Sequence, residues 1–334
     1  MNLNEKFFIS RRKVFTLGAD PEIFVFADNK LLPAFEFLPP KGNGNMMYWD
    51  GMQAEWKYDH LGNYCQNNLV YFTRENLIKL DQKAKAYNPK AKLSLSNVIK
   101  APADILAKAP LPFVELGCQP SYNAYNLEGL RVPNPRRLLY RFAGGHMHFG
   151  TWRQPPNYNL LAQTMDSVLG VWSVGAARNQ DNPIRRKYYG MPGEYRKPKY
   201  EYGYGFEYRV LSNWWLASPG IMQLTWDIGR MSLRLATSRF RNLWNAEKAE
   251  VIDTIKNSDT NQAAKIIQRN LGMFQWILKQ LYSDKPVQHA LDVFNYGLEA
   301  VVPNPNNFKE NWHFNDGWLD DACQWWARWE SCNQ

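Results

Sequence analysis

The pattern of apolar and polar positions changes near residue 218. Before it, short alternating runs bounded by Gly and Pro predict strands, and two stretches with helical spacing of apolar residues interrupt them. The expected strands are Glu22–Ala27, Met47–Lys57, Pro112–Leu116, Gly145–Gly150 and Glu207–Ser212, and the expected helices are Asn67–Ala86 and Leu160–Ala177.

After Pro219 the pattern becomes helical. The expected elements are helices at Gly220–Ala246, Thr260–Tyr282, Pro286–Ala300 and Gly317–Glu330, with a Pro- and Asn-rich connector at Pro303–Phe314. Strands and helices are segregated rather than regularly alternating, which favours an α+β fold over a doubly wound parallel sheet. The chain therefore divides into residues 1–218, a sheet with helices, and residues 219–334, a helical region.

Composition narrows the class of protein. The chain has 334 residues, 45% of them hydrophobic, which excludes a disordered protein. Its longest nearly apolar run, Val168–Ala177, is too short to span a membrane. The order of charge and apolar residues in Met1–Asp20 is not that of a secretory signal, and the four scattered cysteines fit a reducing cytoplasm. The net charge is +9, but the basic residues are dispersed, which disfavours nucleic acid as the main ligand.

Four expected strands each carry two polar side chains two residues apart. The pairs are Asp20 and Glu22, Gln53 and Glu55, His146 and His148, and Glu207 and Arg209. Residues i and i+2 of a strand share a face, and the residues between them, such as Met147, Phe149, Phe206 and Tyr208, can pack the other face. If these strands share a sheet, one face gathers carboxylates and imidazoles, which suit Mg²⁺ or Mn²⁺.

Each pair alone has a simpler interpretation. Asp20–Pro21 can form a turn, Gln53 and Glu55 can lie on a solvated strand face, and Glu207 with Arg209 can form a cross-strand ion pair. A structural role explains the two histidines equally well. Only the coincidence of four pairs favours a metal-binding face.

A basic, aromatic stretch runs from Arg178 to Lys199. Fixed cations beside a divalent-metal site are what phosphoryl transfer requires. The same composition also suits a solvated basic loop, or a loop that binds RNA or DNA with tyrosines for base stacking. The Gly-rich stretches match neither GxGxxG nor GxxxxGK[ST], so a Rossmann or P-loop nucleotide site is not supported.

Six motifs occur in an order that resembles the phage-encoded carboxylate–amine ligases (amidoligases) of the glutamine synthetase and glutamate–cysteine ligase superfamily. They are Gly18–Glu22, Asp50–Glu55, Leu116–Tyr125, Gly144–Gly150, Arg186–Arg196 and Glu207–Trp215. The resemblance covers about residues 14–216, so 1–218 is the expected glutamine-synthetase-like catalytic core. The helical remainder is expected to pack on this core or to serve in assembly.

The resemblance implies a curved, largely antiparallel sheet whose concave face holds ATP and metal, backed by helices. It also implies a reaction in which ATP phosphorylates a carboxylate and an amine then displaces the phosphate to form an amide. The implied metal ligands are Asp20, Glu22, Glu55, His148 and Glu207. His146, His148, Arg186 and Gln53 are the implied nucleotide contacts, and Arg186, Arg196 and Arg209 the implied arginines facing phosphate or substrate carboxylate.

Two other functions compete with an ATP- and Mg²⁺- or Mn²⁺-dependent ligase. A virion or capsid-associated structural protein is suggested by the tryptophans of the tail (Trp312, Trp318, Trp325, Trp326, Trp329), since aromatic residues are enriched in interfaces. A metal-dependent nuclease or phosphatase would share the two-metal chemistry. For the ligase we expect amino acids, peptides or protein side chains as substrates, possible homo-oligomers, no membrane, and a location in the infected cell's cytoplasm or on the virion.

Overall fold

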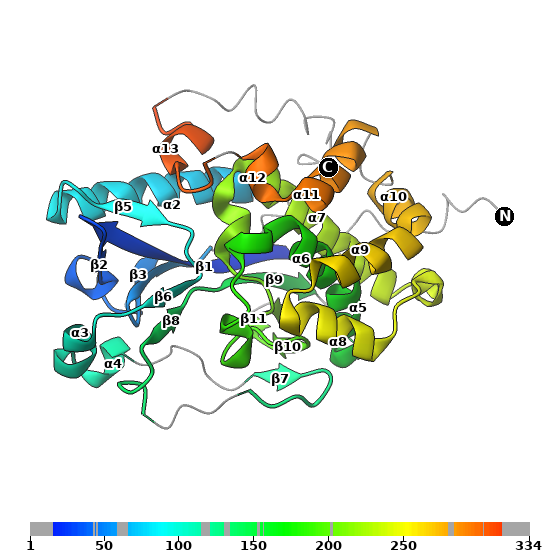
Figure 1. The fold of residues 1–334 in the computed structure, drawn as a ribbon, viewed down its shortest axis with the longest axis horizontal. Coiled ribbons are helices and arrows are strands. Elements are labelled where there is room, and N and C mark those ends of the chain that lie inside the picture. Colours follow the sequence, from blue (N-terminus) through cyan, green and yellow to red (C-terminus); the bar gives the residue numbers. More distant parts are fainter. Residues whose placement is uncertain are drawn as a thin grey trace.

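The computed structural model describes residues 16–42, 44, 46–58, 66–114, 121–129, 134–151, 154–155, 157–200, 203–279, 284–302 and 304–315. An open antiparallel sheet organises the first two thirds of the chain (Figure 1). Its main path runs through β3 (Met47–Asp50), β4 (Gln53–Trp56), β1 (Thr16–Ala27), β9 (Gly145–Thr151), β12 (Gly203–Tyr208), β10 (Glu194–Arg196) and β7 (Tyr122–Asn123).

Shorter strands extend the sheet and flank it. β2 (Lys30–Leu32) and β5 (Lys92–Ser94) pair with β1, and β11 (Lys199–Tyr200) pairs with β12. β6 (Val98–Lys100) and β8 (Tyr140–Phe142) form a separate antiparallel ladder. The pairings between these strands are antiparallel, so the predicted α+β class with a largely antiparallel sheet is confirmed.

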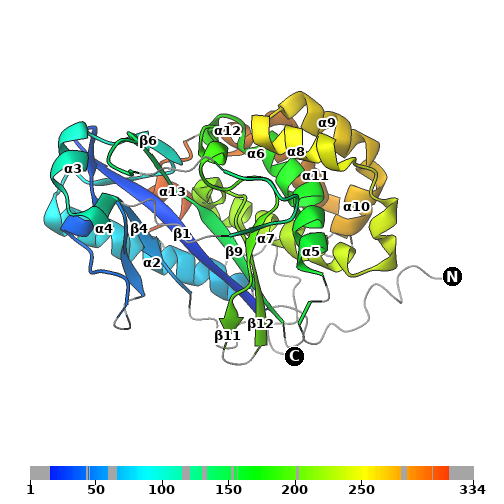
Figure 2. The same cartoon turned by 90° about the horizontal axis from the view of Figure 1, so that it is seen from below.

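The helices that follow residue 157 lie together beside β9 and β12 (Figure 2). Three helices precede this group in the sequence: α2 (Gln66–Tyr87), α3 (Ala103–Lys108) and α4 (Leu111–Val114). The group itself comprises α5 (Tyr158–Met165), a π-helical turn (Asp166–Gly170), α6 (Val171–Ala177), α7 (Pro219–Ala236), α8 (Lys248–Asn257), α9 (Thr260–Arg269), α10 (Leu271–Lys279), α11 (Asp284–Tyr296) and α12 (Leu298–Val301), and α13 (Phe308–Asn311) follows it.

Helix α7, which faces the sheet, begins directly after a capping serine. Ser218 precedes α7, and its side chain accepts a hydrogen bond from the backbone N–H of Ile221. Pro219 occupies the first turn, where its missing N–H costs nothing. Almost every residue of α7 is buried, because this helix lies between the sheet and the other helices.

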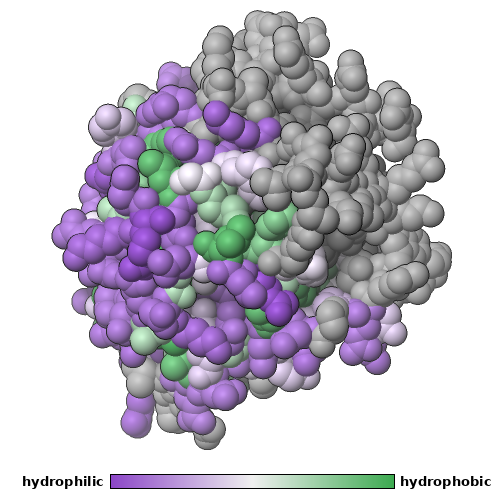
Figure 3. Space-filling view, turned by 90° about the vertical axis from the view of Figure 1, so that its right-hand side faces the viewer, coloured by the Kyte–Doolittle hydropathy of each residue, from purple (hydrophilic) through white to green (hydrophobic). Residues whose placement is uncertain are grey.

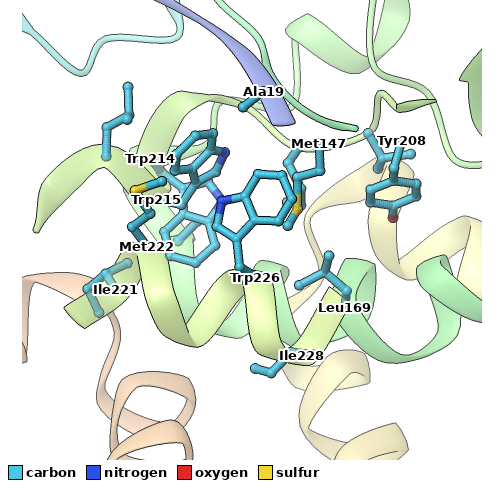
Figure 4. Packing of buried hydrophobic residues seen from close by; sticks show 14 of the residues in the cluster. Ala19, Met147, Leu169, Tyr208, Trp214, Trp215, Ile221, Met222, Trp226 and Ile228 are labelled. Carbon is cyan, nitrogen blue, oxygen red and sulfur yellow. The ribbon is translucent and has the colours of Figure 1, made fainter. Parts of the chain in front are cut away.

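Aromatic and apolar side chains fill the space between the sheet and α7 (Figure 4). Met147 projects from β9 toward Trp226 of α7, and Trp215 makes an edge-on contact with Trp226 at 6.3 Å between ring centroids. The indole N–H of Trp215 donates to the backbone oxygen of Gly145 at 3.0 Å, so this buried tryptophan keeps its polar atom satisfied. The main core is continuous across residue 218.

A smaller core lies on the other face of β1. Phe24 belongs to it, whereas its neighbours Ile23 and Val25 belong to the main core. Phe24 packs with Met52, Ile99 and residues of α3 and α4. This face is therefore covered near the C-terminal end of β1, and the polar side chains of the preceding residues lie beside this cover.

The strand and helix bounds differ from expectation in several places. The described part of the strand expected at Pro112–Leu116 is helical: Leu111–Val114 form α4, where Phe113 stacks on Phe35 at 4.5 Å and Val114 enters the smaller core. The strand expected at Glu207–Ser212 instead spans Gly203–Tyr208. Met47–Lys57 is a hairpin of two strands, not a single strand.

The helices after residue 218 are shorter than expected, because polar residues and glycine interrupt them. The expected helix Gly220–Ala246 ends at Ala236, and α8 was not predicted. Thr260–Tyr282 divides at Asn270, whose side-chain amide donates to the backbone oxygen of Ile266. Pro286–Ala300 divides at Gly297, whose φ of 86° favours glycine.

Two expectations on the tail have different outcomes. The expected connector Pro303–Phe314 contains the short helix α13. The expected helix Gly317–Glu330 lies outside the described residues, as do all four cysteines. In the view of Figure 3, the described residues present mainly hydrophilic side chains around a smaller apolar area.

Candidate active site

Antiparallel pairing aligns candidate side chains across four strands. On β1, Asp20 lies opposite His146 of β9. His148 of β9 lies opposite Glu207 of β12, and Glu207 lies opposite Arg196 of β10. Directly paired residues of antiparallel strands project from the same face. The expected convergence of these side chains on one face is therefore confirmed.

The alignment continues on the other side of β1, where Glu22 lies opposite Glu55 of β4. The residues that alternate with the site residues point into the main core and are almost fully buried: Ala54, Met147, Phe149, Phe206 and Tyr208. One face of the sheet thus packs on helices while the other carries the ionisable side chains.

Asp20, His148 and Glu207 form one group of possible metal ligands, which we call the histidine cluster. One ligand atom of each lies within 4.8 Å of the others. Nε2 of His148 is 3.0 Å from Oδ1 of Asp20, and Nδ1 of His146 is 3.2 Å from the same oxygen. The side chains of Asp20 and His148 are 19% and 21% exposed, so solvent reaches this cluster.

Glu22, Asp50 and Glu55 form a second group, the carboxylate cluster, with the same 4.8 Å limit between ligand atoms. The Tyr48 hydroxyl donates to Oε1 of Glu55 at 2.5 Å, and the Gln53 amide donates to Oε2 of Glu22 at 3.4 Å. Glu22 and Glu55 are almost fully buried. This cluster is the more enclosed of the two.

Tyr189 and His146 connect the two clusters. The Tyr189 hydroxyl lies 3.2 Å from Oε1 of Glu22 and also contacts Nε2 of His146. The other nitrogen of His146 faces Asp20 of the histidine cluster. A continuous polar chain therefore runs from Asp20 through His146 and Tyr189 to Glu22.

The double glycine before His146 makes this arrangement possible. A Cβ on Gly144 would lie 2.3 Å from the Tyr189 hydroxyl, and a Cβ on Gly145 would lie 2.4 Å from the backbone oxygen of Ser212. The Gly144 N–H also donates to Oε2 of Glu22 at 2.7 Å. A side chain at Gly144 would push Tyr189 away from Glu22, and one at Gly145 would push β9 away from Ser212.

Two of the three expected arginines lie at the histidine cluster. Arg209 is buried and forms an ion pair with Oε1 of Glu207, and Nη1 of Arg196 lies 3.6 Å from the same oxygen. The Arg196 side chain is 28% exposed. Arg196 is thus the more accessible cation, whereas Arg209 is buried against Glu207.

Arg186 is placed differently. Its guanidinium is buried in an ion pair with Asp181, which also accepts a hydrogen bond from Asn97 at 2.6 Å. Asp181 belongs to neither cluster, and Nε and Nη1 of Arg186 have no hydrogen-bond partner. The structure gives Arg186 a structural ion pair, and its contact with phosphate stays a prediction.

The carboxylate cluster holds its protons tightly. Burial, together with the charges of Asp50 and Asp20, raises the pKa of Glu22 to about 7. Burial also raises the pKa of Glu55 well above its ordinary value and raises that of Asp50. Carboxylates this close to one another cannot all ionise without a compensating cation.

The histidine cluster has the opposite balance. Burial would raise the pKa of Asp20, but His148 and His146 outweigh burial and hold that pKa well below its ordinary value. The pKa of Glu207 is also lowered, because His148 and Arg209 outweigh burial. Burial and the charge of Arg209 lower the pKa of His146 to about 4, so this imidazole is neutral at pH 7.

Four site residues were not predicted from the sequence as site residues. They are Lys41, Tyr48, Asp50 and Tyr189. Asp50 and Tyr189 stand inside quoted motifs, and Asp50 lies opposite Gln53 at the tight β3–β4 turn. Tyr48 lies opposite Glu55, so the i, i+2 rule applied to β3 would have found both Tyr48 and Asp50.

The donor sets fit a hard divalent cation. The carboxylate cluster offers only oxygen ligands, and the histidine cluster offers two carboxylates with one imidazole. Such sets suit Mg²⁺ and Mn²⁺. The buried carboxylates of Glu22 and Glu55, whose pKa values burial raises, support this fit, because a bound cation would compensate charge that burial otherwise disfavours.

Residues 138–275 match the family described as phage phiEco32-like COOH.NH2 ligase-type 2. The matched segment includes β9, β10 and β12, which carry both histidines, Arg196 and Glu207, and it also includes Arg209, the residue that follows β12. The match confirms the resemblance to phage-type amidoligases. It supports a ligase that joins a carboxylate to an amine.

A comparison with curated proteins and another with solved structures found no match. Among the described residues, the helices are too short or too polar to cross a membrane.

Proposed function

We propose that this chain, whose residues 138–275 match the phage-type COOH.NH2 ligase family, is an ATP- and Mg²⁺-dependent carboxylate–amine ligase that works through an acyl phosphate. One observation carries the proposal. Two adjoining groups of possible metal ligands project from one sheet face, with two arginines against the Glu207 member of one group.

The residues divide by role. Asp20, His148 and Glu207 would hold one Mg²⁺, and Glu22, Asp50 and Glu55 would hold a second. The ions would neutralise the phosphate oxygens of ATP and favour departure of ADP.

Arg196 and Arg209 act on the transferring phosphoryl group. Arg209 is buried in its ion pair with Glu207, while the side chain of Arg196, which is 28% exposed, can reach a ligand. Donors fixed before the reaction stabilise charge as it develops on phosphate. A planar guanidinium can also contact two phosphate oxygens at once.

The proposed reaction balances as two displacements. A substrate carboxylate oxygen attacks the γ-phosphorus of ATP and ADP leaves with the electron pair of the broken P–O bond. The amine nitrogen then attacks the acyl carbon, phosphate leaves with the C–O electron pair, and the nitrogen loses a proton. The products are an amide, ADP and phosphate.

The virion-protein alternative gains no support from the one described tail tryptophan. Trp312 is fully buried, and its indole N–H donates to the backbone oxygen of Leu216 at 2.7 Å. It serves the main core rather than an exposed interface. The other tail tryptophans lie outside the described residues.

The test measures ADP release with Mg²⁺, ATP and a panel of amino acids, peptides and protein extracts from infected cells, with products identified by mass spectrometry. Hydroxylamine in place of the amine should trap the acyl phosphate as a hydroxamate. We expect ADP only when a carboxylate and an amine are both present. Asp20→Asn should abolish product and the distant surface variant Lys90→Met should not; wild-type turnover by Asp20→Asn would refute the assignment.

A further inference from the structure

A single lysine lies at the rim of the carboxylate cluster. Nζ of Lys41 is 3.3 Å from Oε1 of Glu55 and 5.0 Å from the centre of the Tyr48 ring. Its side chain is 61% exposed, whereas that of Glu55 is 3% exposed. Lys41 therefore reaches from solvent to an oxygen of the buried Glu55 side chain.

The backbone before Lys41 is fixed while its side chain is not. The N–H of Trp49 donates to the oxygen of Pro39 at 3.1 Å, and Pro40 forms a β-bridge with Trp49. These contacts hold the chain against β3. The four-carbon stem of lysine can turn its ammonium away from Glu55 without moving this backbone.

The charge balance explains why the ammonium lies there. Three carboxylates, Glu22, Asp50 and Glu55, lie together, and their other contacts described above are neutral hydroxyl, amide or N–H donors. Lys41 is the cation that forms an ion pair with this cluster among the described residues. A divalent ion bound by Glu55 would stand beside the ammonium and repel it.

We propose, resting on the function proposed above, that Lys41 is a built-in counter-cation of the carboxylate cluster. The divalent ion displaces it, and the released ammonium then binds a phosphate oxygen of the nucleotide. Lysine suits this exchange, because its ammonium is a compact point charge on a flexible stem and a common phosphate ligand. Lys41 thus weakens binding of the metal ion alone and strengthens binding of the metal–nucleotide complex.

The experiment measures Mn²⁺ affinity by electron paramagnetic resonance and calorimetry, first with Mn²⁺ alone and then with Mn²⁺ and a non-hydrolysable ATP analogue. It compares wild type, Lys41→Met and Lys90→Met. Methionine keeps the unbranched apolar stem of lysine without its charged end. Lys90 is a matched control, since it is an exposed lysine paired with Asp28 at 3.0 Å, and Asp28 belongs to neither cluster.

Lys41→Met should bind Mn²⁺ alone about two- to fivefold more tightly, the range expected for loss of an exposed ion pair. It should bind the analogue about tenfold more weakly, because a charge-assisted contact is lost. Lys90→Met should change neither. Unchanged or weaker Mn²⁺ binding by Lys41→Met, or unchanged analogue binding, would overturn the inference, whereas wild type that binds no Mn²⁺ would overturn the proposed function itself.

Discussion

Glu22→Gln and Glu207→Gln should change the stability of the metal-free protein in opposite directions. Both residues are buried carboxylates on the same sheet face. Burial and neighbouring carboxylates raise the pKa of Glu22 to about 7, whereas interactions with His148 and Arg209 lower the pKa of Glu207. The two substitutions remove the same charge from opposite electrostatic surroundings.

For Glu22, the sign follows from the raised pKa. The folded protein binds this proton more tightly than the unfolded chain, so the stability it contributes is complete below about pH 4.5 and is lost as the pH rises through about 7. The difference between 4.5 and about 7 corresponds to about 3 kcal/mol at most. Glutamine mimics the protonated acid: its oxygen can accept from Gly144 and its amide can donate to the Tyr189 hydroxyl.

For Glu207, the charge is needed by a buried cation. Arg209 is almost fully buried against this carboxylate, and removing one partner of such a pair leaves the other uncompensated. Glu207→Gln should therefore destabilise the protein at neutral pH by about 3 kcal/mol. That loss should shrink as the pH falls through the lowered pKa of Glu207.

The assay is urea unfolding followed by tryptophan fluorescence, with a chelator present, at pH 5 and pH 8. At pH 8, Glu22→Gln should unfold at higher urea than wild type and Glu207→Gln at lower urea. Added Mn²⁺ should stabilise wild type by mass action but protect Glu22→Gln much less. Destabilisation of metal-free Glu22→Gln at pH 8, or equal protection by Mn²⁺, would refute the reasoning.

Three further outcomes follow from the site and its support. Arg196→Ala should slow single-turnover ADP formation about 10²- to 10³-fold with little loss of nucleotide affinity, and Arg196→Lys should recover only part of the rate. Gly144→Ala should weaken Mn²⁺ binding in calorimetry and lower stability by about 1–3 kcal/mol, since its Cβ would lie 2.3 Å from the Tyr189 hydroxyl. Burial raises the pKa of Asp166 to about 7, and the Tyr208 hydroxyl donates to this carboxyl group. The unfolding free energy of wild type should therefore fall by at most about 4 kcal/mol between pH 4 and 7, and this fall should be absent in Asp166→Asn. An Asp166→Asn variant with the pH profile of wild type would contradict this.

The candidate site could be predicted largely because its signals are local. In any β-strand, residues two positions apart project from the same face, whatever the neighbouring strands are. The spacing of His146 and His148 therefore predicts that both side chains share a face of β9. The same rule placed Asp20 and Glu22 on one face. Register between strands could not be derived from these pairs, and here the resemblance between motifs, not periodicity, indicated that the strands share a sheet.

Contacts made across long sequence distances were beyond local reasoning. Tyr189 reaches Glu22 over 167 positions, and nothing in its neighbourhood distinguishes it from Tyr188. Arg186 shows the converse: a basic stretch predicted contact with phosphate, while the fold places its guanidinium on Asp181. The sequence shows where charged residues are concentrated along the chain. It does not show which group each charge contacts, because that depends on tertiary packing.

The start of α8 carries no usual cap sequence. Glu247 and Glu250 form a capping box there, with the Glu247 N–H donating to Oε2 of Glu250 at 3.4 Å. The usual capping box has Ser or Thr in place of Glu247, so the sequence does not mark this helix start clearly. Single apolar residues of the 3-10 turn Arg239–Leu243 continue the apolar period of α7, so periodicity alone predicts one helix as far as Ala246.

The two clusters share one face of the sheet but differ in how their negative charge is compensated. They should therefore differ in how much each gains from binding a metal ion. Asp20 and Glu207 already face Arg209, Arg196 and His148, so the histidine cluster is ionised and paired without an ion. Among the described residues, the carboxylate cluster forms an ion pair with the exposed ammonium of Lys41, and burial raises the pKa values of Glu22 and Glu55. A divalent cation therefore gains more unpaired negative charge at the carboxylate cluster, and must displace protons and Lys41 to obtain it. The polar chain through His146 and Tyr189 joins the clusters, so occupation of one fixes side chains that the other uses.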